Sequence, residues 1–339
     1  MREFDLINLI RDRCAPQRED VRLGIGDDAA LLAVPAGQLL AVSTDTLIAG
    51  VHFPHGTNAG DVGWKVLAVN LSDLAAMGAT PAWATLALTL PTSDRAWVTQ
   101  FADGFAALAR DYKLALVGGD TTQGPLSVTV TIHGFIPDGA ALLRGGARVG
   151  DGVFVTGTLG DAAAGLRLVN GAAPGPPAIE GSGEAQSPPL ESPARVSARA
   201  TLLARLNRPQ PRVVQGLLLR GRASACIDIS DGLVADLAHV CAASGAGAEI
   251  DVECLPASSA LLSVFDESER RDCQLSGGDD YELCFTAGSA AAPTLLADLA
   301  RSGCGATCIG RIVPQPGVCV RDGAGARIAV ARPGWEHFR

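Results

Sequence analysis

The stretch Leu114-Ala115-Leu116-Val117-Gly118-Gly119-Asp120-Thr121-Thr122 joins a short apolar run to a cluster of glycine and aspartate. The apolar run predicts a buried β-strand. The cluster after it predicts a strand end where a carboxylate lies beside backbone that can approach a ligand closely. Similar clusters recur along the chain, and several of them also follow or adjoin an apolar run. They are Gly24-Ile25-Gly26-Asp27-Asp28, Ser43-Thr44-Asp45-Thr46, Asn70-Leu71-Ser72-Asp73, Asp228-Ile229-Ser230-Asp231-Gly232 and Gly277-Gly278-Asp279-Asp280.

Short apolar strands alternate with helical stretches, which predicts an α/β protein of two domains. A break rich in glycine and proline at residues 138–152 separates an N-terminal domain, residues 1–140, from a C-terminal domain, residues 141–339. The expected N-terminal helices are 61–77, capped by Asp61 and ended by Gly78, and 94–112. The other expected elements are strands 39–43, 85–90, 114–117, 127–135, 153–156, 226–229, 248–252, 282–286 and 308–313, and helices 161–169 and 233–243.

Residues 171–193 interrupt this alternation. Gly, Ala, Pro, Ser and Glu dominate the segment, and it contains no aromatic residue. Such a composition buries too little apolar surface to offset the entropy of ordering the chain. We therefore expect a flexible surface insertion in the C-terminal domain.

The composition narrows the class of protein. The chain has 339 residues, of which 47% are hydrophobic, and a formal net charge of −9. Nucleic-acid binding is disfavoured because it needs a basic surface. We find no apolar stretch of membrane-spanning length and no secretory signal, so we expect no membrane association and a cytoplasmic protein. The nine cysteines are scattered without a Cys-x-x-Cys pair, which indicates reduced thiols.

Carboxylates that gather in one place repel each other unless cations lie between them. Mg²⁺ prefers such oxygen ligands, and sites of this kind usually handle phosphates. A single Gly-Asp is usually a turn residue, but six clusters in one chain favour a shared site. Arg144 follows the last N-terminal strand and could bind nucleotide phosphates through two hydrogen bonds.

Other phosphate and hydrolytic motifs are missing from the sequence. Neither of the two lysines, Lys65 and Lys113, follows a glycine, so no P-loop is present. His-Arg-Asp and G-x-S-x-G are absent, which disfavours protein-kinase and serine-hydrolase chemistry. Residues 24–29 match the dinucleotide fingerprint only weakly, because two adjacent carboxylates would face the pyrophosphate. Metal-assisted phosphoryl transfer remains as the best interpretation.

At these clusters the chain resembles the thiamine-monophosphate kinase family, of the aminoimidazole-ribonucleotide-synthetase-like superfamily. The resemblance covers nearly the whole chain and includes Gly50-Val51-His52-Phe53 and Gly334-Trp335-Glu336-His337-Phe338. It implies an α/β (α+β) fold whose N-terminal mixed sheet with helices pairs in a homodimer, and a C-terminal α/β sandwich. It also implies ATP-dependent phosphorylation of thiamine monophosphate to thiamine diphosphate, by direct transfer of the γ-phosphate assisted by Mg²⁺.

The resemblance further implies roles for individual residues. Asp45, Asp120 and Asp231 are expected to carry catalysis. The nucleotide is expected to contact Gly119, Asp120, Arg144 and Ser230, and the substrate His52, Asp279 and Trp335. Asp279 stands where glutamate is common in the family. The expected metal ligands are Asp28, Ser43, Thr44, Asp45, Asp73, Asp120, Asp228 and Asp231.

Alternatives remain open at this point. Trp335 offers a flat π-face to a cationic ring, but it could also be a tail residue that packs on the core. His52 could be an ordinary hydrogen-bonded loop residue, and Arg144 could form a surface salt bridge. The chain could also be a sibling synthetase that makes aminoimidazole ribonucleotide or selenophosphate; the latter should have a reactive cysteine in a glycine-rich loop, which Cys14 lacks. A non-catalytic nucleotide- or metal-binding scaffold should have lost aspartates that are all present here.

Overall fold

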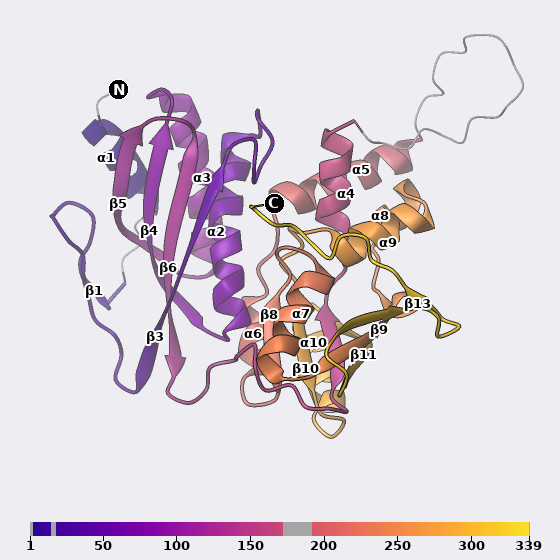
Figure 1. The fold of residues 1–339 in the computed structure, drawn as a ribbon. Coiled ribbons are helices and arrows are strands. Elements are labelled where there is room, and N and C mark those ends of the chain that lie inside the picture. The colour runs from indigo at the N-terminus through magenta and orange to yellow at the C-terminus, as the bar shows by residue number, and fades with distance from the viewer. Residues whose placement is uncertain (1–2, 15–17, 172–191, 339) are drawn as a thin grey trace, which may run out of the picture.

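A four-stranded mixed sheet organises the N-terminal half of the computed structural model, which describes residues 3–14, 18–171 and 192–338 (Figure 1). The strand order is β3-β6-β4-β5, in which β3, β6 and β4 are antiparallel neighbours and β4 and β5 are parallel. The strands are β3 (Gln38–Ile48), β4 (Thr80–Leu90), β5 (Ala115–Gln123) and β6 (Ser127–Pro137).

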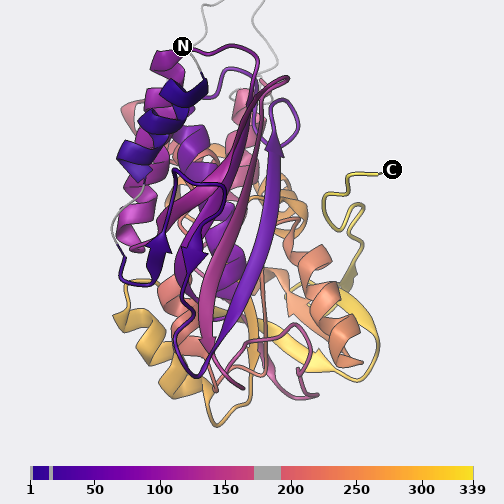
Figure 2. The ribbon, with the colours of Figure 1, turned by 90° about the vertical axis from the view of Figure 1, so that its left-hand side faces the viewer.

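The two faces of this sheet have different neighbours. Alternate residues of β6, Val128, Val130 and Ile132, are fully buried on the face that packs against α2 (Ala59–Ala76), which we call the inner face. Helix α3 (Arg95–Asp111) packs beside α2, and α1 (Glu3–Cys14) packs against α3 and β5. The opposite, outer face is covered at one end by β1 (Val21–Leu23) and β2 (Leu31–Leu32), as Figure 2 shows.

The C-terminal half is built on a seven-stranded sheet with the order β13-β12-β9-β11-β7-β10-β8. Its pairs are antiparallel except for β9 and β12. The strands are β7 (Gly152–Thr156), β8 (Ala225–Asp228), β9 (Gly247–Asp251), β10 (Leu283–Ala287), β11 (Ala306–Val313), β12 (Gly317–Arg321) and β13 (Arg327–Ile328). The helices are α4 (Asp161–Val169), α5 (Pro193–Asn207), α6 (Val213–Leu219), α7 (Leu233–Ser244), α8 (Ser259–Val264), α9 (Glu267–Ser276) and α10 (Ala292–Arg301), with a short 3₁₀ turn at Val252–Cys254.

Helix α2 joins the two halves. It lies between the sheets and contacts both α6 and β8 (Figure 1). Nearly all of its residues are buried, and one apolar cluster continues from α2 through Val213 and Leu219 to Phe285. The mixed α/β fold that the sequence predicts is thus confirmed, and α2 brings the first half against the carboxyl end of β8. Among the helices of the described residues, none has both the length and the apolar character needed to cross a bilayer.

Several local predictions differ from the structure. Asn58, and not Asp61, caps α2, because its side chain accepts a hydrogen bond from the Gly60 amide at 2.8 Å. Asp61 instead pairs with Arg208 at 2.5 Å. Gly78 follows the helix with φ +65°, as predicted for a C′ glycine. The expected insertion at 171–193 lies almost wholly outside the described residues.

Two clusters lie within strands and not at strand ends. β3 extends through Asp45 to Ile48, and β5 extends through Asp120 to Gln123. Threonine hydroxyls continue the pairing of β3 with β6, because Thr44 bonds to Thr131 at 2.9 Å and Thr46 to Thr129 at 2.8 Å. The short apolar runs therefore understate the length of both strands.

Candidate active site

A cleft of about 1140 Å³ lies between the two halves of the molecule. Its walls come from α2, the end of β3, α4, the loop after β8, α9, the loop before β10 and the C-terminal segment. The cleft collects carboxylates from distant parts of the sequence: Asp45, Asp73, Asp228, Asp231 and Asp279. Five of the aspartates singled out in the sequence therefore lie around one space.

Asp45 and Asp73 form a close pair at the N-terminal wall. Asp45 extends from the inner face of β3, and Asp73 from the last turns of α2. Ser43 Oγ donates a hydrogen bond to Asp73 Oδ2 at 2.5 Å. Burial, followed by the charge of Asp73 and a hydrogen bond to it, raises the pKa of Asp45 to about 7. Burial also raises the pKa of Asp73.

Asp228 and Asp231 approach this pair from the C-terminal half. Asp228 ends β8, and Ser72 Oγ of α2 donates to its Oδ2 at 2.7 Å. Burial, followed by repulsion from Asp73, raises the pKa of Asp228 to about 8. Burial raises the pKa of Asp231 as well. The pKa values of these four carboxylates are raised chiefly by burial, and cations between them would favour their ionised forms.

The arrangement of donors limits how a metal could bind. Among the described residues, no three His, Cys, Asp or Glu side chains converge on a point where they could hold one ion. Mg²⁺ typically binds one or two carboxylates and completes its shell with water and substrate phosphates. The spread of Asp45, Asp73, Asp228 and Asp231 around the cleft fits that mode better than a closed protein cage.

The loop that carries Ser230 and Asp231 is fixed by Asp236. One carboxylate oxygen of Asp236 accepts hydrogen bonds from the amides of Ser230, Asp231 and Gly232 at 3.0, 3.1 and 3.1 Å. Burial raises the pKa of Asp236 to about 6. Asp236 was not predicted as a site residue, although an aspartate in the first turn of a helix is a usable signal.

The three predicted substrate residues line the cleft, and two of them, His52 and Trp335, both contact the His337 ring. The His52 and His337 rings lie 5.1 Å apart, and Trp335 meets His337 edge-on. The Trp335 amide donates to the Asp231 carbonyl at 3.0 Å, which docks the C-terminal segment beside the loop after β8. Trp335 is 55% exposed, so its ring is available at the cleft and is not part of the core.

His52 also has a local role. Its Nδ1 accepts a hydrogen bond from the Ile48 amide at 3.0 Å, which fixes the ring at the end of β3. Burial lowers the pKa of the imidazole. His52 is therefore both a hydrogen-bonded loop residue and part of the cleft wall.

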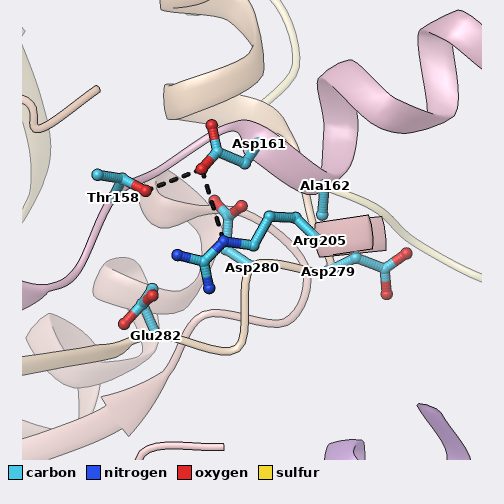
Figure 3. Close-up of a pocket in the computed structure, with 7 residues that line it drawn as sticks. All are labelled: Thr158, Asp161, Ala162, Arg205, Asp279, Asp280 and Glu282. Carbon is cyan, nitrogen blue, oxygen red and sulfur yellow. Dashed lines mark hydrogen bonds and ion pairs between the residues drawn. The ribbon is translucent and has the colours of Figure 1, made fainter. Parts of the chain in front are cut away.

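The motif that contains Asp279 has a buried side, shown in Figure 3. Asp280 accepts a hydrogen bond from the Gly160 amide at 2.8 Å, and Glu282 pairs with Arg212 and accepts from Thr156 Oγ1 at 2.6 Å. In the same view Asp279 points away from these anchors. Asp280 and Glu282 thus hold the loop in place, while Asp279 faces the cleft.

The remaining predicted residues do not line the cleft. Across the sheet, Asp120 of β5 lies opposite Ala87 of β4. Ala87 lies opposite Thr129 of β6, and Thr129 lies opposite Thr46 of β3. Directly opposed residues share a face, so Asp120 lies on the outer face of the sheet, away from Asp45.

Thr44 lies on the outer face too, where it bonds to Thr131. Gly119 precedes Asp120 in β5 and lies opposite Leu86 on the inner face, and Asp28 is exposed between β1 and β2. Arg144 is exposed, and its charge opposes the burial that raises the pKa of Asp73 and Asp231. The structure therefore divides the predicted site residues into a cleft group and an outer-face group of Asp28, Thr44 and Asp120, and Gly119 and Arg144 belong to neither.

Comparisons with known proteins agree with this picture. The model of the family "AIR synthase related protein, N-terminal domain" matches residues 26–136, and that of its C-terminal domain matches residues 148–323. A thiamine-monophosphate kinase of Salmonella typhimurium is 46% identical over 99% of this chain and 98% of its own. A thiamine-monophosphate kinase of Haemophilus influenzae is 38% identical over 100% of this chain and 98% of its own.

Solved structures are also similar. A thiamine-monophosphate kinase from Stenotrophomonas maltophilia K279a has a TM-score of 0.83 and 49% identity, covering 94% of this chain and 96% of that one. The structure of AaThiL complexed with AMPPCP and TMP has a TM-score of 0.74 and 33% identity, and the match covers 100% of this chain and 99% of that one.

Proposed function

Because the chain belongs to the thiamine-monophosphate kinase family, we propose that it transfers the γ-phosphate of ATP to thiamine monophosphate and forms thiamine diphosphate. The observation that carries the proposal is the carboxylate-lined cleft in a chain that is similar along its full length to AaThiL, which was solved with AMPPCP and TMP. Full-length similarity to thiamine-monophosphate kinases does not favour a sibling synthetase.

The chain's own residues divide the work in this proposal. Asp45, Asp73, Asp228 and Asp231 hold Mg²⁺, which when bound neutralises phosphate charge and polarises the transferred group. Ser230 lies on a loop fixed by Asp236, where it can meet the nucleotide. Arg144, near Asp73 and Asp231, supplies a cation for nucleotide phosphates. His52, Asp279 and Trp335 orient the acceptor so that its phosphate faces the carboxylates.

We further propose that a second copy of the chain covers the outer face of the N-terminal sheet. Leu40, Val42 and Ile48 of β3 expose 42%, 56% and 40% of their surface on that face. An apolar row of this kind, beside rows of threonine, is more typical of a covered surface than of one facing water. The outer-face group, Asp28, Thr44 and Asp120, would then lie at or near the junction of the two copies.

Acceptor specificity tests the proposed activity. Purified protein with ATP and Mg²⁺ is offered thiamine monophosphate, free thiamine or an aminoimidazole-ribonucleotide precursor, and the products are separated by chromatography. We expect turnover of thiamine monophosphate and little of free thiamine, which lacks the phosphate nucleophile. Turnover of the ribonucleotide precursor in place of thiamine monophosphate would identify the sibling activity.

A further inference from the structure

Lys65 is a buried cation in the middle of α2. The residue is 2% exposed, and its neighbours in the helix, Val62, Val66 and Val69, are apolar and buried. An ammonium group in such surroundings is unfavourable unless a carboxylate compensates it. Its Nζ donates to Asp279 Oδ2 at 2.9 Å, the one hydrogen bond of this group within the part of the chain that the structure describes.

Asp279 occupies an unusual backbone conformation. Its φ is +69° and that of Tyr281 is +50°, and Lys113 is the one other non-glycine residue with positive φ among those described. Such conformations persist where surrounding contacts impose them. Here the Asp279 amide donates to the Ser230 carbonyl at 2.9 Å, and the Tyr281 amide to the Ile229 carbonyl at 2.8 Å. The loop before β10 is therefore fastened to the loop that carries Asp231.

Both oxygens of the Asp279 carboxylate are held from within the protein. Tyr281 Oη donates to Oδ1 at 3.0 Å, and Lys65 holds Oδ2. The side chain of Asp279 is still 27% exposed and lines the cleft. Asp279 thus has a buried cation, Lys65, on one side, and the exposed part of its carboxylate faces the cleft.

The ion pair also links the two halves of the molecule. Lys65 belongs to the helix that carries Asp73, and Asp279 to the loop that packs on Ser230. Gly278 shows how closely the loops fit, because a Cβ there would lie 2.4 Å from the Ser230 carbonyl oxygen. The hydrogen bond from Lys65 consequently helps to fix the position of the Asp279 carboxylate relative to Asp73 and Asp231.

We propose that Lys65 is a positioning residue for acceptor recognition and acts through Asp279. It fixes a charge-compensated carboxylate at the cleft wall, where that carboxylate meets the cationic or amino-bearing rings of the acceptor. The proposal rests on the proposed function, because the acceptor is taken to be thiamine monophosphate.

The test compares Lys65→Met with Lys113→Met, the same change at an exposed lysine that does not line the cleft. Lys65→Met should raise KM for thiamine monophosphate by about tenfold or more, and KM for ATP by less than about twofold. Lys113→Met should match the wild type. A lower melting temperature with both KM values unchanged would overturn the proposal and leave Lys65 as a structural ion pair.

A double-mutant cycle separates action through Asp279 from general damage. Asp279→Asn alone and Asp279→Asn with Lys65→Met should have nearly the same KM for thiamine monophosphate. If Lys65→Met alone fails to fold, the double variant still allows the test, because it leaves no carboxylate without its cation. A further large rise in the double variant would overturn action through Asp279. Wild-type turnover of thiamine monophosphate tests the proposed function separately, so the two failures are distinguishable.

Discussion

Asp45 and Asp120 point to opposite faces of the same four-stranded sheet. Asp45 lies opposite Val130 on the inner face, whereas Asp120 lies opposite Ala87 on the outer face. β3 and β5 are also the two edge strands, separated by three strand spacings, or roughly 14 Å. The two carboxylates of one copy therefore cannot bind the same metal ion.

This separation predicts complementation between subunits. Asp45→Asn and Asp120→Asn should each lower kcat by about a hundredfold or more with little change in melting temperature, because each removes a charged ligand from the reaction site. If Asp120 serves the cleft of the partner copy, mixing the two variants under conditions of subunit exchange should restore about a quarter of wild-type activity.

The control for complementation is each variant mixed with itself. Mixing without recovery, in samples shown to contain mixed dimers, would show that Asp120 does not serve the cleft of the partner copy. A fully active Asp120→Asn variant would remove it from the site altogether.

Trp335→Ala should raise KM for thiamine monophosphate about 5- to 150-fold, the range expected when an aromatic stacking contact of roughly 1–3 kcal/mol is lost. KM for ATP should change little, because Trp335 lies beside His337 and His52 at the substrate side of the cleft. Trp335→Phe should recover much of the loss. Steady-state kinetics with each substrate varied decides this, and equal effects on both KM values would contradict it.

The pKa shifts of the cleft carboxylates predict how pH and Mg²⁺ affect stability. The pKa values of Asp45 and Asp228, about 7 and about 8, lie above those of the unfolded chain. The folded protein therefore binds more protons than the unfolded chain between about pH 4 and pH 8, and these groups make it less stable as pH rises across that range. Mg²⁺ should raise the melting temperature more at pH 8 than at pH 6, where protons compete for the same oxygens.

Asp228→Asn supplies the matched test of that account. Without metal at pH 8, this variant should have a higher melting temperature than the wild type. Mg²⁺ should raise its melting temperature by less than it raises that of the wild type. The control is Asp12→Asn, an exposed residue of α1. A wild-type protein whose melting temperature responds to Mg²⁺ equally at both pH values would contradict the account.

Much of the fold could be predicted from the periodicity of apolar residues and from the glycine, proline and capping residues between elements. The apolar runs located β4, β6, β7 and β8, and Asp94 was correctly placed at the start of α3, where its side chain accepts from the Ala96 amide at 2.8 Å. Short or amphipathic elements such as α1, β12 and β13 were not predicted. β12 and β13 are too short to show a clear periodicity, and the buried side of α1 is defined by its contacts with α3 and β5.

The site was accessible from the sequence only in part. Glycine and aspartate clusters pointed to Asp45, Asp73, Asp228, Asp231 and Asp279, which the fold brings to one cleft. The faces of β3 and β5 could not be assigned, because the strands were expected to end before Asp45 and Asp120. Lys65 was missed because a lone lysine in a helix carries no signal until its burial and its partner are known.

Deleting residues 172–189, with a short Gly-Ser join, should leave activity within about threefold, since the entropy of loop closure depends only logarithmically on length. The deletion lies outside the described residues and keeps Asn170, which lines the cleft at the end of α4. Kinetics of the deletion variant measure the effect. A large loss of activity in a variant that is folded would show that the segment contributes to the cleft.

The most direct measurement follows the label of [γ-³²P]ATP in the presence of Mg²⁺ and thiamine monophosphate. Direct transfer predicts that the label appears in thiamine diphosphate, in a one-to-one ratio with ADP and with little labelled inorganic phosphate. Label released as inorganic phosphate while thiamine monophosphate remains unchanged would contradict the account.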